Sequence, residues 1–149
     1  MRHILVGILT ALVLAAAAPG VKTQFIGGTL SGVKAKSAAR IDLTDPVALS
    51  FQCGSTALRI DYRKVNTLEY GQNVSRRYAA AILISPVLLL SKSRRHYITL
   101  GYEDETGKQQ ALVFRVEKGD IRTLLASLEA RTGRRVEYQD VEARKAGKG

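Results

Sequence analysis

Few side chains in this sequence have the types and spacing that catalysis or metal binding requires. His96 is the only histidine after residue 3, so a zinc site lacks a second imidazole. Ser31 and Lys34 match an S-x-x-K motif, but the S-D-N motif that accompanies it in penicillin-recognising enzymes is missing. The acidic stretch 103–106 is typical of a hairpin turn, because calcium would need six or more oxygen ligands. We therefore predict that the protein is not an enzyme and that it uses no metal and no cofactor.

The most unusual stretch is residues 76–95, RRYAAAILISPVLLLSKSRR, an apolar segment with basic residues at both ends. No Asp or Glu occurs from residue 70 to residue 102. Residues 79–90 are apolar except for one Ser-Pro pair. As a helix, these residues would reach only about 18 Å, whereas the hydrocarbon core of a membrane is about 30 Å thick. Pro86 would also interrupt a helix, so we do not expect this segment to span a membrane.

Three interpretations of this segment stay open. It packs against the rest of the fold, it dips into a membrane surface, or it contacts a protein partner or a second copy of the chain. We favour the membrane, because apolar burial and basic attraction to anionic lipids reinforce each other, and a loop that only packs inward needs no basic ends. The predicted membrane- or partner-binding residues are Arg76, Arg77, Ile82, Leu83, Ile84, Val87, Leu88, Leu89, Lys92, Arg94 and Arg95.

The overall charge agrees with an anionic partner. The chain carries a formal net charge of +10. Nucleic acid is an alternative partner, since phosphate contacts need Lys and Arg. The chain has no tryptophan and no evident platform on which bases could stack, as single-strand binders require. We therefore expect an anionic lipid surface or a protein partner, and a homo-oligomer is compatible with the same segment.

The N-terminal residues have the layout of a targeting segment. Residues 1–17 combine a short basic start, an apolar stretch and alanines that offer a cleavage site, which is typical of a secretory signal peptide. We therefore predict export to the periplasm or the extracellular space, with a peripheral position at a membrane. Residues 18–37 are predicted to be a flexible leader with at most one short strand, GTLSGV, and residues 140–149 a frayed basic tail.

Period-2 alternation predicts strands through most of the chain. It occurs in ARIDL, ALSFQC, ALRIDY and TLEYG, and again on both sides of the DETG turn in residues 96–118. In ALSFQC, Leu49, Phe51 and Cys53 fall on one face of the strand. Cys53 is the single cysteine of the chain, so no internal disulfide can form, and we expect its side chain to be buried as a small hydrophobe.

One amphipathic helix is predicted over residues 120–132. Asp120 is placed as an N-cap and Gly133 as a left-handed stop. The stretch RRVEYQ after it suggests a final short strand. The apolar stripe that should face the core consists of Ile121, Leu124, Leu125 and Leu128.

Strands followed by one helix indicate an α+β fold that is mainly antiparallel β. The succession IDLTDPVALSF, LRIDYRKVNTLEYG, HYITLGYEDETGKQQALVFRV and DIRTLLASLEARTG resembles bacterial pleckstrin-homology-like (PH-like) domains over residues 38–139, with 76–95 as an apolar insert. The resemblance implies a partly open barrel capped by a C-terminal amphipathic helix, which binds lipids or proteins without chemistry. Lipid-binding members use a basic cluster in the first hairpin loop. We do not transfer that site to Lys34, Lys36 and Arg40, because we expect the stretch VKAKSAAR that supplies them to come before the first strand rather than in a hairpin loop.

Overall fold

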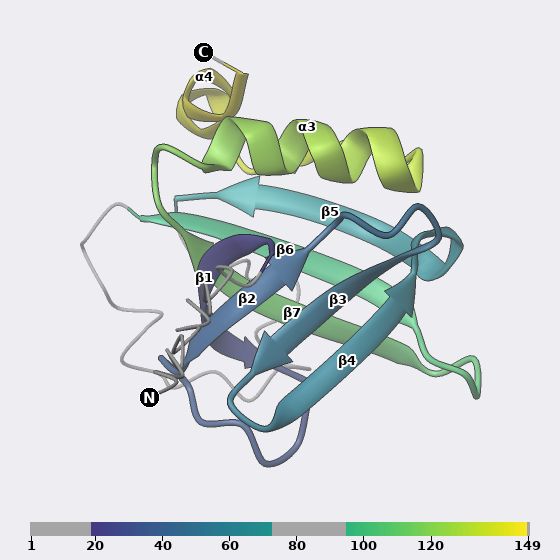
Figure 1. Cartoon of the computed structure of the whole chain (residues 1–149). Helices are drawn as coiled ribbons and strands as arrows, with labels where there is room; N and C mark the ends of the chain where they lie inside the picture. Colours follow the sequence, from purple (N-terminus) through teal and green to yellow (C-terminus); the bar gives the residue numbers. More distant parts are fainter. Residues whose placement is uncertain (1–18, 73–94, 149) are drawn as a thin grey trace, which may run out of the picture.

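The computed structural model describes residues 19–72 and 95–148, which form one open sheet and three helical elements (Figure 1). The sheet order is β4-β3-β2-β1-β7-β6-β5-β8. All neighbours pair antiparallel except β5 and β8, which pair parallel. The strands are β1 (Val21–Gly28), β2 (Ala38–Asp42), β3 (Ala48–Cys53), β4 (Thr56–Asp61), β5 (Val65–Gly71), β6 (His96–Glu103), β7 (Gln109–Val116) and β8 (Glu137–Tyr138). The helical elements are the 3₁₀ turn η1 (Tyr62–Lys64), α3 (Ile121–Thr132) and α4 (Val141–Lys148).

The sheet curves strongly around one core. The register shifts between Phe25 and Gly27 in β1 and between Val65 and Thr67 in β5, and such bulges bend a strand and increase its twist. In Figure 1 the strands β2, β3 and β4 form one part of the curved sheet, while α3 and α4 lie together near β5. The concave inner face therefore encloses the space into which α3 packs.

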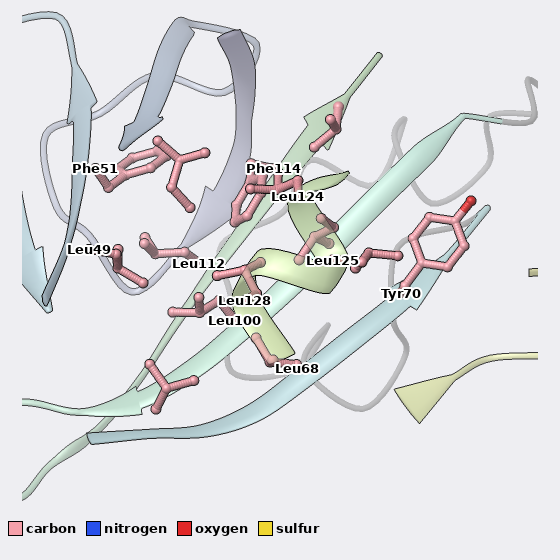
Figure 2. Packing of buried hydrophobic residues seen from close by; sticks show 14 of the residues in the cluster. Leu49, Phe51, Leu68, Tyr70, Leu100, Leu112, Phe114, Leu124, Leu125 and Leu128 are labelled. Atoms are coloured by element: carbon pink, nitrogen blue, oxygen red, sulfur yellow. The ribbon is translucent and has the colours of Figure 1, made fainter. Parts of the chain in front are cut away.

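The inner face holds the main hydrophobic core, here called the inner-face cluster. Figure 2 shows Leu124, Leu125 and Leu128 of α3 among side chains of β5, β6 and β7. Phe51 bridges towards the rest of the sheet, with its ring centroid 6.1 Å from that of Phe25 and 6.2 Å from that of Phe114. Strands from both parts of the sheet thus share one core with the helix, and this confirms the α+β class and the predicted apolar stripe.

The predicted cap is present at the C-terminal end of α3 but not at its N-terminal end. Gly133 has the predicted left-handed conformation, with φ of 68°, and its N–H donates to the Glu129 carbonyl at 2.9 Å. The prediction of a side-chain cap at Asp120 is wrong. Its backbone is already helical, with φ −98° and ψ −13°, and its carboxylate makes no cap hydrogen bond. A capping side chain needs an extended backbone to reach the first-turn N–H groups.

The expectation of a flexible leader over residues 18–37 is also wrong. β1 lies in the middle of the sheet between β2 and β7, and the stretch GTLSGV does not form the expected strand. β1 shows little alternation, since Ile26 falls at the bulge and two glycines follow it. The β1–β2 connection, residues 29–37, therefore carries Lys34 and Lys36, and the folded domain begins before residue 38.

The C-terminal residues are folded rather than frayed. β8 confirms the predicted short strand, and α4 follows it. Asp140 starts α4 by accepting a hydrogen bond from the Ala143 N–H at 2.6 Å on its Oδ1 atom. Ala143 is fully buried against the inner-face cluster. Tertiary packing therefore stabilises a helix that its polar composition did not predict.

Candidate anion-binding face

Most of the predicted binding residues lie outside the described part of the chain. This applies to Arg76, Arg77, Ile82, Leu83, Ile84, Val87, Leu88, Leu89, Lys92 and Arg94, for which the prediction stays a prediction. Arg95 is described and exposed. Its backbone N–H donates to the Gln72 carbonyl at 3.5 Å. The connection between β5 and β6 therefore leaves and re-enters the sheet at adjacent points.

Three further cations project from the outer, convex face near this end of the sheet. Lys22 of β1 lies directly opposite Arg40 of β2, and Arg115 of β7 lies opposite both Gln24 and Tyr97. Residues that are opposite each other in an antiparallel ladder project from the same face. Their strand neighbours, such as Ile41 and Phe114, point into the inner-face cluster. We call Lys22, Arg40, Arg115 and the nearby Arg95 the basic strip.

The basic strip borders an open hollow of about 480 Å³ that is lined by Lys22, Ala38, Arg40, Gln52 and Gly54, among others. A like-charged pair in direct register is destabilising by itself. Nη1 of Arg40 donates to the Gly20 carbonyl at 2.9 Å, which fixes the guanidinium beside the hollow. An anion placed there would be attracted by the charges of both Lys22 and Arg40.

Arg115 is held less tightly at the edge of the strip. Its side chain is about one quarter exposed, and its Nη2 lies 3.9 Å from Oε1 of the largely exposed Glu117. Exposed ion pairs of this kind contribute little to stability. The Arg115 guanidinium can therefore turn to an external anion at small cost.

A second basic hollow, of about 380 Å³, lies at the C-terminal end of α3. Its contacts serve the fold: Nε of Arg134 donates to the Val65 carbonyl at 3.1 Å, Glu129 Oε1 accepts the Val136 N–H at 2.8 Å, and Lys148 Nζ lies 5.6 Å from the centre of the Tyr138 ring. These contacts join α4 and β8 to the rest of the domain. The cations that line it are Arg134, Arg135, Arg144 and Lys148.

A third hollow, of about 280 Å³, lies between β4 and the β6–β7 hairpin. Its charges are paired locally: Lys64 Nζ lies 2.9 Å from Glu105 Oε1, and Arg59 Nη1 lies 2.8 Å from Asp45 Oδ2 outside the hollow. The acidic residues of the lining, Asp61, Glu103, Asp104 and Glu105, outnumber its two cations, so the hollow has no excess of positive charge that would attract an anion. It is a weaker candidate than the basic strip.

His96 and Cys53, two residues with reactive side chains, both pack within the fold. Nδ1 of His96 lies 2.6 Å from the Tyr70 hydroxyl oxygen, and the two rings stack with centroids 6.0 Å apart. Burial lowers the pKa of His96 below its ordinary value. Cys53 is buried as predicted, with 4% of its surface exposed, and burial raises the pKa of its thiol.

The acidic stretch 103–106 forms the predicted hairpin turn. Oδ1 of Asp104 accepts hydrogen bonds from the Thr106 N–H at 2.9 Å and the Lys108 N–H at 3.0 Å. Hydrogen bonds from the Thr106 hydroxyl and from these N–H groups hold the pKa of Asp104 well below its usual range. Within residues 19–72 and 95–148, no cluster of three or more His, Cys, Asp or Glu residues could hold a metal ion.

Comparison with known proteins leaves the family open. Neither a protein-family model nor a curated protein matches this sequence. Among the described helices, none combines the length and the apolar character needed to cross a membrane. The function must therefore be inferred from the placement of charge and apolar surface on the described residues.

Proposed function

We propose that this protein is a non-catalytic, PH-like binding domain that docks on an anionic membrane surface through its basic strip. The observation that carries the proposal is the like-charged pair of Lys22 and Arg40, which lie in direct register beside an open hollow. The PH-like assignment is supported by an open, curved, mainly antiparallel sheet with a C-terminal helix packed into its concave face.

The position of the strip supports a membrane as the anionic partner. Arg95 ends the segment whose other cations, at positions 76, 77, 92 and 94, were predicted to contact lipid headgroups. Each Lys or Arg near an anionic leaflet contributes about 1 kcal/mol, and salt screens that attraction. No described aromatic side chain lines the hollow, so it offers no stacking platform for the bases of a nucleic acid.

Two parts of the sequence prediction remain separate proposals. Insertion of residues 82–89 into lipid concerns side chains outside the described part of the chain, and export concerns residues 1–17. Binding through the basic strip requires neither of them, because its four cations all lie outside residues 1–17 and 82–89. The strip can therefore be tested by itself.

The test is co-sedimentation with lipid vesicles at low salt. We expect binding to vesicles that contain phosphatidylserine or phosphatidylglycerol, weak binding to neutral phosphatidylcholine vesicles, and loss of binding as salt rises. The double variant Lys22→Gln/Arg40→Gln removes two near-surface cations, so its affinity should fall by about thirtyfold.

The matched control is Arg135→Gln/Arg144→Gln, which removes the same charge from the second basic hollow. It should retain most of the binding to anionic vesicles. Equal losses in both variants would mean that net charge alone drives binding, and the basic strip would then not be the site. Tighter binding of the parent to an oligonucleotide than to anionic vesicles at the same salt concentration would overturn the membrane proposal in favour of nucleic acid.

A further inference from the structure

The outer face of the sheet has an apolar area beside the basic strip. Thr99 of β6 lies opposite Val113 of β7, which lies opposite Gly27 of β1, so these residues point away from the inner-face cluster. The area, here called the outer apolar patch, is buried although it lies on the convex side. Its members and their exposed fractions are Ile26 2%, Tyr97 5%, Thr99 2%, Ala111 3% and Val113 0%.

The same face of the sheet is solvated elsewhere. On the outer face of β3 and β4, Gln52 lies opposite Ala57, and both are exposed, as is Arg59. An antiparallel sheet with one face in water shows such small or polar residues on that face, whereas apolar residues on both faces indicate that both are covered. β6 and β7 are therefore built to be covered on their outer side.

No described apolar side chain outside the sheet is available to cover the patch. Those of α3 and α4 that are buried, such as Leu124 and Ala143, belong to the inner-face cluster. In the described connections, Leu30, Val33 and Leu43 also pack against that cluster. The large apolar residues that remain, Val47 and Val141, are 53% and 69% exposed.

We propose that the outer apolar patch is the docking site for residues 79–90 of the same chain. The ends of the connection lie beside the patch: Gln72 and Arg95 are joined by a backbone hydrogen bond, and Tyr97 of the patch follows two residues later. Residue 79 follows Gln72 by seven positions, a reach of up to about 23 Å. The three strands of the patch span only about 10 Å, so residues 79–90 reach every part of it.

The chemistry of the two surfaces matches. Residues 79–90 are apolar except for one Ser-Pro pair, and the patch consists of aliphatic and aromatic surface with the Thr99 hydroxyl. Each square ångström of apolar surface removed from water contributes roughly 25 cal/mol, and neither partner presents a charge inside the contact. The basic ends of the segment then remain at the surface, next to the basic strip.

Docking selects one of the three interpretations of the segment, namely packing against the fold, and it replaces the insertion of residues 82–89 into lipid. It does not rest on membrane binding through the basic strip. Docking concerns the apolar residues 79–90, whereas membrane binding concerns the cations of the basic strip. A protein whose segment is docked can still bind anionic vesicles, and a protein whose strip is inactive can still have a docked segment. The two proposals therefore fail independently.

The direct test is the nuclear Overhauser effect (NOE) between methyl groups in the full chain without lipid. We expect contacts from the Val113 and Ile26 methyls to the Ile, Leu and Val methyls of residues 82–90. Contacts to residues 4–14 instead, or contacts seen only between differently labelled molecules in a mixed sample, would overturn the proposal in favour of the N-terminal segment or a second copy. Exposure of Val113 methyls to a soluble paramagnetic probe would overturn it as well.

A second test uses chymotrypsin, which cleaves after leucines such as Leu83 and Leu88. Cleavage there should be slow in the parent and about tenfold or more faster in Val113→Glu, because a carboxylate in the patch disfavours docking. The matched control Val47→Glu makes the same change at an exposed valine and should cleave like the parent. Rapid cleavage within residues 79–90 of the parent would overturn the proposal. If Val113→Glu fails to fold, the NOE measurement on the parent decides the question without any variant.

Discussion

Leu128→Ala should destabilise the protein through the contact between α3 and the sheet. Leu128 is fully buried in the inner-face cluster, and the substitution removes about three carbon groups at about 0.8 kcal/mol each. The cavity left behind adds to this loss, so we expect a total of about 2–5 kcal/mol. Leu125 is 2% exposed in the same cluster, and Leu125→Ala should cost a similar amount.

Urea unfolding followed by circular dichroism measures this loss. For an m-value of about 2 kcal/mol/M, a loss of about 3 kcal/mol lowers the urea midpoint by about 1.5 M. Arg122→Ala is the control, because Arg122 lies on the exposed side of the same helix and alanine preserves helix propensity. If both leucine variants unfold at the midpoint of the parent, α3 does not complete the core, and the account of the fold is refuted.

Two further predictions concern single buried side chains. Cys53 should react slowly with a thiol reagent in the native protein and rapidly in urea, because it is 4% exposed; rapid native labelling would contradict its place in the core. For His96, burial lowers the pKa in the folded protein, so the unfolded chain takes up a proton more readily. Stability should therefore be complete above the ordinary histidine pKa of about 6.5 and should fall as the pH drops below it. His96→Gln should reduce the change in urea midpoint between pH 7.5 and pH 5, and an unchanged dependence would show that another group is responsible.

Alternation and turn chemistry were sufficient to predict strands β2 to β7 and helix α3. β1 could not be predicted in the same way. It lies in the middle of the sheet, its Ile26 falls at a bulge, and Gly27 and Gly28 add no side chains to the pattern. α4 has a polar composition and depends on tertiary contacts, such as the approach of Gly147 to the Tyr138 and Tyr70 rings.

The basic strip could not be predicted from the sequence, because its cations come together only through the pairing of the strands. Lys22 lies in a stretch that was expected to be a leader, and only the register of β1 on β2 places it opposite Arg40. The outer apolar patch, in contrast, could have been predicted from the sequence. In YITLGY and ALVF, apolar or small residues occupy successive positions, so both faces of β6 and β7 lack charge, which indicates strands covered on both sides.

If the protein binds membranes as proposed, the basic strip faces the anionic lipid headgroups. The most direct measurement is residue-resolved NMR line broadening on nanodiscs of anionic lipid that carry a paramagnetic headgroup label. We expect the strongest broadening at Lys22, Arg40, Arg95 and Arg115, little effect at Arg135 and Arg144, and loss of the effect in high salt. Broadening centred on Arg135 and Arg144, or none on anionic nanodiscs at low salt, would contradict the proposal.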